Sequence, residues 1–352
     1  MNETKLENGP AAASEGIDKT AGTSVFINSK KENIFKPIQA VSGVVQRKQP
    51  LPVLSNILFV QKGKQVTLVA NDLDLQILTV AEIGEENSEM STTISARKLT
   101  DILATLPDTN PLSFSKKGDH VVLSSGKSKF ELQTISAEEF PVITEVDLEH
   151  AFTMSCLRFK YLLNMVSFAC AVNNVRYFLN GVYICAENNK VRGVATDGHR
   201  LALCDVEAEK TADKKLDAIL PRKTVKELVR LIPDSQDPIE VYISERQIKF
   251  KFVGIEILSK LVEGRYPDYQ RVIPEHNEKE FRVGRQELLS SLQRVATLTA
   301  DNLWESAGTL HRATLMSLPT MRTWRKPKTK SPLNTVALRL KSVLMSPTSS
   351  KF

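Results

Sequence analysis

The sequence predicts an α+β fold made of repeated domains, each with two helices and an antiparallel sheet. Two observations carry this prediction: a repeat of about 125 residues, and short alternating strands interrupted by two helical segments in each copy. A composition with 41% hydrophobic and 25% charged residues is that of an ordinary folded protein. A chain of 352 residues is long enough for two or three such domains.

The repeat is visible as a series of segments that recur in the same order. The pairs are KPIQAVS (36–42) with YLLNMVS (161–167), LSNILF (54–59) with FLNGVY (178–183), VAND (69–72) with VATD (194–197), ARKLTDILATLP (96–107) with PRKTVKELVRLIP (221–233), and EEFPVI (138–143) with GRYPDY (264–269). Because their spacing stays close to 125 residues throughout, residues 24–147 and 148–272 are predicted to be two copies of one domain.

Each copy is expected to open with an amphipathic helix. In the first copy Ile34, Ile38, Val41 and Val45 fall on one helical face. In the second copy this apolar face is formed by Leu162, Val166 and Cys170. Alternating segments such as QVTLVA and KVRGVA follow and are typical of half-buried strands.

A second helix is expected later in each copy, and it begins with two basic residues. In the first copy Ser95 is the expected N-cap before Arg97 and Lys98. In the second copy Pro221 is expected at the first helical position, before Arg222 and Lys223. Further strands complete each domain, and the helices are expected to cover one face of the sheet.

A third copy begins but is not continued. Residues 273–302 contain FRVGRQELLSSLQRVATLTADN (281–302), which repeats the first-helix pattern with Leu288, Leu292 and Val295 in phase. From Leu303 onward neither the alternation nor a second helix can be found. At the other end, the polar residues 1–23 are expected to form a disordered leader.

The segment 303–352 differs from the rest of the chain in charge and composition. It holds nine Lys and Arg residues and one acidic residue, whereas residues 1–302 hold 38 basic and 40 acidic residues. One missing nucleotide near Asn302–Leu303 would explain the difference. When the codons for TMRTWRKPKTKSPLNTVA are read one base out of phase, they permit the amino-acid sequence NENMEEAEDEITVEYSG. This alternative sequence has the acidic turn and alternating strand that a third copy requires. We therefore interpret 303–352 as an out-of-frame, disordered tail; the alternative is a basic disordered tail that binds nucleic acid through its charge.

Four motifs together resemble the β sliding clamp family of bacterial DNA polymerase III. They are RKQPLPVLSN (47–56), VRYFLNG (175–181), VATDGHRLAL (194–203) and RYPDYQRVIP (265–274), and the resemblance covers about residues 24–302. It implies a DNA-clamp fold with two complete domains and an incomplete third one. It also implies a non-catalytic subunit whose head-to-tail homodimer encircles duplex DNA. Its expected partners are non-specifically bound double-stranded DNA, the clamp loader, the polymerase III catalytic subunit and other proteins with clamp-binding motifs.

A sliding clamp should hold phosphates by charge without reading bases. The repeat places Arg97/Lys98 and Arg222/Lys223 at equivalent helix starts, and Arg47 and Lys48 follow the first helix. Without the repeat, the simpler interpretation of each basic pair is a solvent-exposed helix start with no binding role. The resemblance implies that the DNA-contacting positions of the family correspond here to Lys48, Arg97, Asn173, Tyr177 and Phe178. At two of these positions the family more commonly has other residues: Arg in place of Lys48 and Tyr in place of Phe178.

The resemblance also implies a groove that binds short partner peptides through apolar anchors. The matching residues are Arg176, Leu179, Thr196, Gly198, His199, Arg200, Leu201, Pro267, Arg271 and Val272. An apolar floor of Leu179, Leu201, Pro267 and Val272 with two arginines at its rim is suited to such anchors. The remaining wall would have come from the third domain.

Other chemistry is disfavoured by the motifs. Asp197 could orient His199 as a base, but they lie two residues apart in an expected turn, with Gly198 supplying an unusual backbone angle. Asp72 and Asp74 could bind a metal, yet a structural turn is the simpler interpretation. No nucleotide-binding glycine motif occurs, so no cofactor, catalytic residue or metal site is expected. The cysteines lack metal-ligand spacing, and with no apolar run of membrane length the chain is expected to be cytoplasmic.

Two functional hypotheses remain at this stage. The first is a β clamp whose activity is impaired by the loss of its third domain. The second is a ring-incompetent monomeric remnant, with residual non-specific DNA binding through its basic tail. They differ in whether the chain can dimerise.

Overall fold

The structure is a computed structural model that describes residues 24–46, 49–86, 88–273, 284–296, 306–311 and 314–319. The predicted 1–23 leader and most of the predicted out-of-frame tail lie outside these residues. The chain divides into two compact units, one ending at Tyr266 and the other beginning at Pro267. Each is described by itself.

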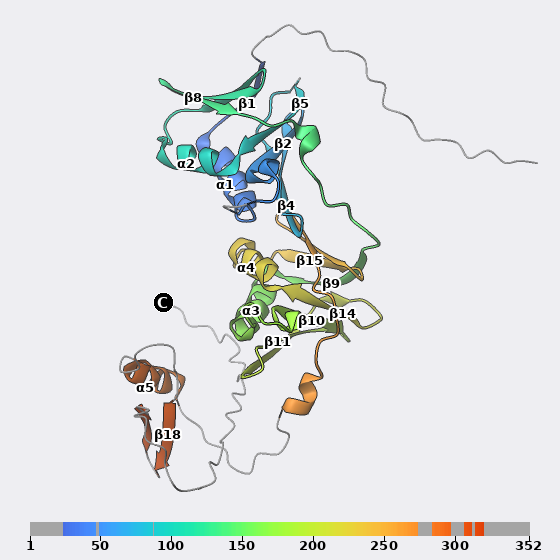
Figure 1. Cartoon of the computed structure of the whole chain (residues 1–352), viewed down its shortest axis with the longest axis vertical. Helices are drawn as coiled ribbons and strands as arrows, with labels where there is room; N and C mark the ends of the chain where they lie inside the picture. The colour runs from blue at the N-terminus through green and yellow to red at the C-terminus, as the bar shows by residue number, and fades with distance from the viewer. Residues whose placement is uncertain are drawn as a thin grey trace, which may run out of the picture. The chain divides into compact units, whose positions relative to one another are not determined.

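The first unit opens with the first of its two domain-like halves, called repeat 1. Its elements are β1 (Ser24–Ser29), α1 (Lys31–Ser42), β2 (Asn56–Lys62), β3 (Gln65–Asn71), β4 (Leu75–Glu82), β5 (Glu89–Ser95), α2 (Ala96–Thr105), β6 (Leu112–Lys117), β7 (His120–Ser125) and β8 (Ser128–Gln133). Repeat 2 follows with β9 (Glu149–Ser155), α3 (Cys156–Val166), β10 (Gly181–Glu187), β11 (Lys190–Thr196), β12 (Leu201–Glu207), β13 (Lys210–Thr211), β14 (Leu216–Pro221), α4 (Arg222–Leu231), β15 (Pro238–Ile243), β16 (Gln247–Phe252) and β17 (Ile255–Lys260). Apart from the short strand β13, which only repeat 2 contains, the same order of helices and strands therefore occurs twice (Figure 1).

The strands of each repeat are shared between two antiparallel sheets, whereas the sequence predicted one sheet. Repeat 1 contributes the sheet β1-β6-β7-β8, and repeat 2 contributes β12-β11-β10-β14. The remaining strands form one nine-stranded sheet in the order β13-β9-β15-β16-β17-β4-β3-β2-β5. In it β17 pairs with β4, so one sheet runs across the boundary between the repeats.

The predicted helices are present, with small differences at their ends. Ile34, Ile38 and Val41 are buried on α1 as the periodicity predicted, but Val45 lies beyond the end of the helix. Ser95 occupies the N-cap of α2, although its side chain makes no capping hydrogen bond. Pro221 is the N-cap of α4, one position earlier than predicted.

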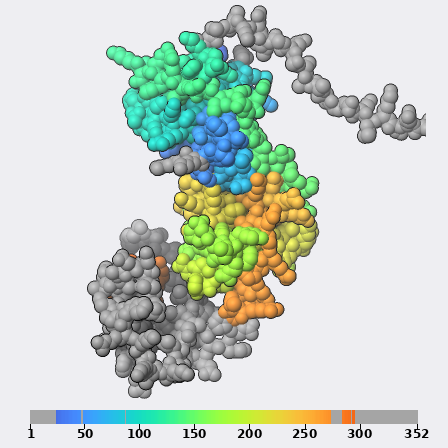
Figure 2. Space-filling view, in the orientation of Figure 1, coloured from blue at the N-terminus to red at the C-terminus, as the bar shows by residue number. Residues whose placement is uncertain are grey.

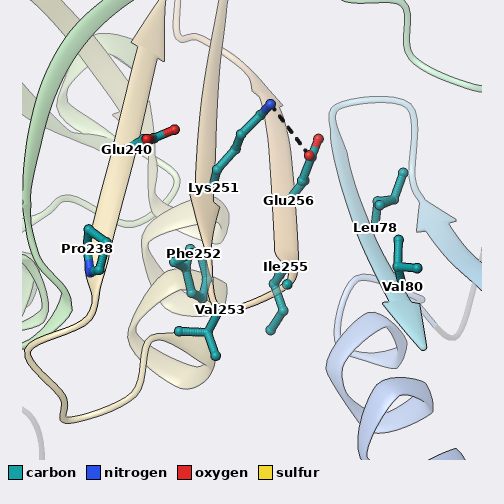
Figure 3. Close-up of a pocket in the computed structure, with 10 residues that line it drawn as sticks. Leu78, Val80, Pro238, Glu240, Lys251, Phe252, Val253, Ile255 and Glu256 are labelled. Carbon is teal, nitrogen blue, oxygen red and sulfur yellow. Dashed lines mark ion pairs between the residues drawn. The ribbon is translucent and has the colours of Figure 1, made fainter. Parts of the chain in front are cut away.

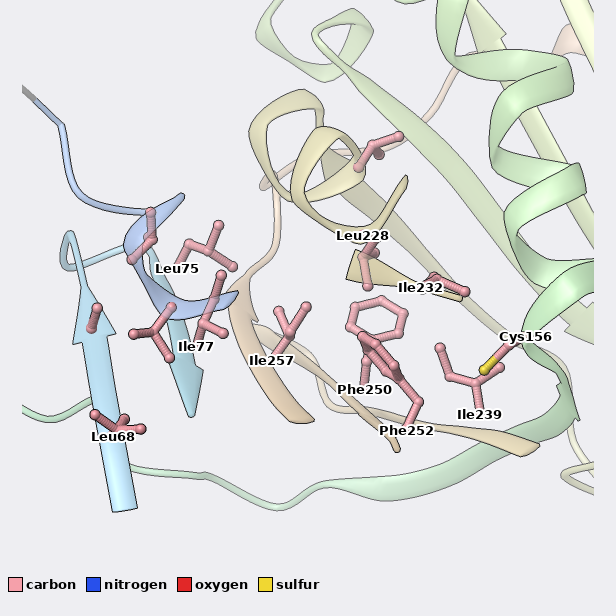
Figure 4. Close-up of a cluster of buried hydrophobic side chains, with 14 of the residues drawn as sticks. Leu68, Leu75, Ile77, Cys156, Leu228, Ile232, Ile239, Phe250, Phe252 and Ile257 are labelled. Atoms are coloured by element: carbon pink, nitrogen blue, oxygen red, sulfur yellow. The ribbon is translucent and has the colours of Figure 1, made fainter. Parts of the chain in front are cut away.

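One hydrophobic core extends through both repeats. Its members include Ile77 on β4 and Ile257 on β17, which are directly opposite each other in the sheet, and both are fully buried. From Ile257 the cluster continues to Phe250 and Leu228 of repeat 2 (Figure 4). In the space-filling view the blue surface of repeat 1 meets the yellow surface of repeat 2 (Figure 2). Because the core is shared, the two repeats are expected to unfold together.

The segment that connects the repeats is attached to the sheets along its length. Asn71 Nδ2 donates to the Pro141 carbonyl, and Gln76 Oε1 accepts from the Ile143 amide at 2.9 Å. Gln247 Nε2 donates to the Thr144 carbonyl at 2.9 Å, and Gln247 Oε1 accepts from the Val146 amide at 3.0 Å. Lys249, whose side chain is 8% exposed, forms ion pairs with Glu145 and Glu256. Residues 141–146 are therefore a strap on the sheet and not a free linker.

The second unit contains a short helical turn at Tyr269–Val272, the helix α5 (Arg285–Ala296) and a hairpin. The helix predicted for the third copy is thus present. Strands β18 (Ser306–His311) and β19 (Thr314–Pro319) pair as the hairpin inside the segment predicted to be disordered. For these residues regular structure replaces the expected disorder, while the domain boundaries at 147/148, 272/273 and 302/303 remain predictions.

Within the residues that the structure describes, no helix is both long and apolar enough to cross a membrane. All four cysteines have free thiols; Cys156, Cys170 and Cys185 are buried, and Cys204 is half-buried. Burial raises the pKa of the Cys170 thiol to about 11, despite the opposing charge of Arg222. This thiol is therefore protonated near neutral pH, as suits a core residue.

Candidate functional site

The first turn of α2 carries the two basic residues predicted for DNA contact in repeat 1. Arg97 and Lys98 are both exposed, because the apolar face of α2 is formed by Ala96, Leu99 and Leu103. Arg97 Nε lies 3.7 Å from Asp101 Oδ2, and 79% of the arginine side chain remains exposed. An exposed pair of this kind is weak, so both cations are free to meet an external phosphate.

The equivalent residues of α4 are placed differently. The Arg222 guanidinium donates to the Cys170 carbonyl at 3.1 Å. Lys223 Nζ reaches into repeat 1, where it forms an ion pair with Asp72 and donates to the Val44 carbonyl at 3.3 Å. The structure thus gives Lys223 an intramolecular partner that the repeat alone did not predict.

The loop before β10 holds the other predicted DNA contacts of repeat 2. Asn173 has a φ of 53°, a left-handed conformation that asparagine tolerates better than most residues. Tyr177 is 59% exposed, and its ring packs edge-on against Phe178 with centroids 6.1 Å apart. An exposed tyrosine beside a half-buried phenylalanine presents a flat aromatic surface and one hydroxyl.

The predicted peptide groove is represented in the first unit by the turn between β11 and β12. Thr196 Oγ1 donates to the Arg200 carbonyl at 2.7 Å and accepts from the Gly198 amide at 3.1 Å. Gly198 has a φ of 92°, and a Cβ at this position would lie 2.9 Å from Arg176 Nη2. A side chain at 198 would therefore be strained and would press on the arginine.

The other groove residues of this unit differ in exposure. His199 and Arg200 are exposed, and the Arg200 guanidinium lies 5.8 Å from the centre of the Phe168 ring. Leu201 is half-buried, whereas Leu179 is only 2% exposed. Leu179 therefore offers little surface to a partner.

Asp197 organises the turn by hydrogen bonds and does not orient the His199 ring. Its Oδ1 accepts from the His199 amide at 2.9 Å and the Arg200 amide at 3.0 Å, and its Oδ2 accepts from Arg200 Nε at 3.0 Å. Burial opposes ionisation, but these hydrogen bonds hold the pKa of the carboxyl below its ordinary value of 3.8. The turn interpretation of TDGHR is confirmed.

Replacing Asp197 with alanine is expected to loosen this turn. Loss of three hydrogen bonds should lower the free energy of unfolding by about 1–3 kcal/mol and speed amide exchange at His199 and Arg200. Because the folded pKa is lowered, the stabilisation holds above pH ~4 and disappears as pH falls through the folded value. Hydrogen exchange of parent and variant measures the effect; unchanged protection of both amides would contradict it.

A matched control is Asp205→Ala, since Asp205 also binds an arginine but on an open strand. Arg192 Nε and Nη2 donate to its two oxygens at 2.6 and 2.7 Å. The pair is more than a third exposed, so its loss should cost less than ~1 kcal/mol and leave the 196–200 turn unchanged.

The remaining predicted site residues lie elsewhere. Arg47 and Lys48 are outside the described residues. Pro267, Arg271 and Val272 belong to the second unit, where Arg271 Nε pairs with Asp268 Oδ2 at 2.8 Å and Val272 is 68% exposed. Their part in a groove stays a prediction.

Asp72 and Asp74 form a turn, as the simpler interpretation held. Asp72 Oδ1 accepts from the Asp74 amide at 3.2 Å and the Leu75 amide at 2.9 Å. Asp74 Oδ1 lies 3.2 Å from Lys260 Nζ. Among the described residues, no group of three or more His, Cys, Asp or Glu side chains could hold a metal ion.

The structure also contains a pocket that the sequence did not predict. It has a volume of about 330 Å³ and lies on the nine-stranded sheet where β4 meets β17 (Figure 3). Leu78 and Val80 line one side, and Val253 and the Lys251–Glu256 pair line the other. It was missed because its two sides are more than 150 residues apart and meet only through the pairing of β17 with β4.

Comparison with known proteins identifies the family. Residues 25–144 match the family model described as the N-terminal domain of the DNA polymerase III beta subunit, and residues 153–268 match its central domain. The chain is 35% identical over 270 residues to the beta sliding clamp of Pseudomonas putida, covering 77% of this chain and 74% of that protein. Against the beta sliding clamp of Escherichia coli K12 the identity is 33% with the same coverage.

Solved structures agree with this result. The sliding clamp of Bartonella birtlesii superposes with a TM-score of 0.78 at 34% identity, covering 83% of this chain and 79% of the other. The clamp of Pseudomonas aeruginosa gives a TM-score of 0.73 at 33% identity, with 78% and 74% covered. The DNA-clamp fold expected from the resemblance is confirmed. The chain belongs to the beta sliding clamp family, the non-catalytic processivity subunits of DNA polymerase III.

Proposed function

We propose that this sliding clamp chain binds duplex DNA non-specifically through the exposed charges of its helix starts and the adjacent loop. The observation that carries the proposal is the free, exposed Arg97–Lys98 pair at the start of α2. Asn173, Tyr177 and Phe178 add polar and aromatic surface, and Arg47 and Lys48 belong to the proposal by sequence alone. In this proposal the contacts are with phosphates and not with base edges, so binding should depend on phosphate charge.

The boundary between the repeats supports assembly by repetition. There β17 of repeat 2 pairs with β4 of repeat 1, and α4 caps the end of α1. Position by position, β8 of repeat 1 corresponds to β17, and β12 of repeat 2 corresponds to β4. Within the described sheets both are end strands. A third domain could pair with β12, and β8 could pair with the third domain of a second subunit, giving a head-to-tail homodimer.

The chain as printed is proposed to be impaired in that assembly. Residues 303–352 lack the acidic turn and alternating strand of a third copy, and they carry nine basic residues instead. A partner would find few of the contacts that a dimer interface of at least ~1,000 Å² requires. The result would be a monomer in the cytoplasm that keeps two clamp domains.

The 196–200 turn is proposed to be part of a site for partner peptides. Arg176, His199 and Arg200 supply donors, and Leu201 supplies an apolar contact, while Pro267 and Val272 belong to the proposal by sequence alone. The polymerase III catalytic subunit, the clamp loader and other proteins with clamp-binding motifs are the proposed partners. If so, Asp197→Ala should also weaken capture of a peptide with apolar anchors, which calorimetry can measure.

Neutralising the α2 cations tests the DNA proposal. Logarithmic affinity falls with logarithmic salt concentration in proportion to the number of phosphates contacted. The double change Arg97→Gln and Lys98→Gln should therefore reduce the magnitude of this slope by about 1–2. Fluorescence anisotropy of a labelled duplex between about 50 and 200 mM salt measures it.

Two controls separate this proposal from binding by the tail. Lys64→Gln removes an exposed charge from a hairpin, where Lys64 pairs with Glu86, and should leave the slope unchanged. Deleting residues 303–352 removes the basic tail together with the β18–β19 hairpin and leaves both repeats intact. If that deletion abolishes binding while the α2 double variant retains the full slope, the tail and not α2 binds DNA.

A further inference from the structure

We propose that Lys223 is a positioning residue that locks repeat 2 onto repeat 1 through Asp72, and that it does not contact DNA. This inference refines the proposed DNA-binding surface, since Lys223 was predicted to be part of it. It rests on the burial of the Asp72 side chain, on the number of donors that converge on this side chain, and on a second cation, Arg230, that α4 places against the end of α1.

Asp72 is a buried carboxylate with all of its partners in place. Its side chain is 5% exposed, and Oδ1 accepts from two backbone amides of its own turn. Oδ2 accepts from Gln46 Nε2 at 3.1 Å and from Lys223 Nζ. Among the described residues Lys223 is the cation that pairs with this charge, and a buried carboxylate without its cation is costly.

The ammonium of Lys223 is held by repeat 1 on two sides. Besides Asp72 it donates to the carbonyl of Val44, which lies just beyond the end of α1. Its side chain is 33% exposed, and its ion pair and hydrogen bond both go to repeat 1. Two of its three N–H donors are therefore used within the chain, and a phosphate that took the place of Asp72 would leave that carboxylate buried and unpaired.

Arg230 supplies a second cation from α4 to the same helix end. Its Nη1 donates to the Gln39 carbonyl at 3.1 Å and its Nη2 to the Ala40 carbonyl at 2.7 Å. The last turn of α1 contains no basic residue of its own. Because helix C-termini favour cations, α4 completes α1 with charges from the neighbouring repeat.

The fit at this contact is close. A Cβ on Gly43 would clash with Arg230 Nη2 and Glu227 Oε2, so a larger residue at this position would displace the side chains of the pair. Glu227, 6% exposed, binds Arg230 Nε at 2.8 Å and neutralises it. The Glu227–Arg230 pair of α4 therefore meets repeat 1 at the end of α1, and Lys223 forms a second ion pair with Asp72 in the turn between β3 and β4.

Lys98 shows that the role comes from the contact and not from the sequence motif. It occupies the position in ARK that Lys223 occupies in PRK, yet it is exposed. The same two-residue signal thus yields a free cation in repeat 1 and a junction cation in repeat 2.

A double-mutant cycle on the full chain tests the assignment. Lys223→Gln should lower the melting temperature by about 6–12 °C, because it strands a buried carboxylate. Adding Asp72→Asn should restore at least half of the loss, since the charge that needed Lys223 is then absent. Lys98→Gln, the matched control, should change the melting temperature by less than ~1 °C.

Hydrogen exchange gives a readout specific to the junction. Lys223→Gln should speed exchange in β4 and β17, and Asp72→Asn should reverse the change. In DNA titrations well below the melting temperature, Lys223→Gln should keep the parental salt slope. The unfolding and exchange measurements involve no DNA, so they decide the assignment even if the chain fails to bind it.

Several outcomes would overturn the inference. These are a melting temperature within ~1 °C of the parent for Lys223→Gln, strictly additive losses in the double variant, or a salt slope reduced by about 1 with stability unchanged. If Lys223→Gln fails to fold, a folded Lys223→Gln/Asp72→Asn double variant supports the lock, and an unfolded one refutes it.

Discussion

Inserting one nucleotide in the gene near codons 302–303 is expected to convert a monomer into a stable dimer. In our interpretation the shifted codons permit the acidic turn and alternating strand of a third copy. We expect that copy to attach by strand pairing of the kind that joins β17 to β4. A completed third domain could then bury the ~1,000 Å² or more that a stable interface needs. Light scattering of both gene products at equal concentration measures the change.

DNA retention gives a second measure of ring closure. The restored dimer should remain on nicked circular DNA and slide off when that DNA is made linear, whereas the chain as printed should do neither. A synonymous change at the same codons is the control. If the chain as printed already forms a tight dimer with this topological behaviour, the loss-of-ring proposal is wrong.

Phe250→Ala is expected to have the largest effect on stability. Phe250 is fully buried on β16 and packs against Phe159 with ring centroids 5.8 Å apart. Removing a buried phenylalanine ring should lower the free energy of unfolding by about 3–5 kcal/mol. Urea denaturation followed by circular dichroism measures this loss.

The shared core makes a more specific outcome testable. Since the cluster runs from Phe250 through Ile257 to Ile77, Phe250→Ala should also speed exchange of the most protected amides in repeat 1. Val80→Ala, at a side chain 45% exposed on β4, should cost less than ~1 kcal/mol. If repeat 1 keeps its full protection in Phe250→Ala, the repeats unfold independently.

The helices could be predicted because their information is local. Ile34, Ile38 and Val41 recur at helical spacing, and burial of that face on α1 follows directly. The division of each repeat into two sheets could not be predicted, because it depends on which strands pair. The pairing of β17 with β4 joins residues more than 170 positions apart, and the apolar alternation within one strand does not indicate which strand it pairs with.

The candidate site divides in the same way. The turn at Asp197–Gly198 could be predicted from its own residues, since a carboxylate that accepts from the amides two and three positions later, followed directly by a glycine, defines it. The role of Lys223 could not be predicted from the sequence, because Asp72 lies 151 residues earlier and becomes its partner only when the two repeats pack together. Motif similarity predicted four equivalent cations, and tertiary contacts made them unequal.

The strap at residues 141–146 has a consequence for the thermodynamics of binding. If the connection were flexible, the two clamp domains would adopt many relative orientations. A ligand that contacts both domains would then lose binding free energy by restricting those orientations. Here Gln76, Gln247 and Lys249 hold the connection against the sheet in the unbound chain. The orientational entropy is thus lost during folding, so a duplex or peptide that spans both domains binds a preorganised surface.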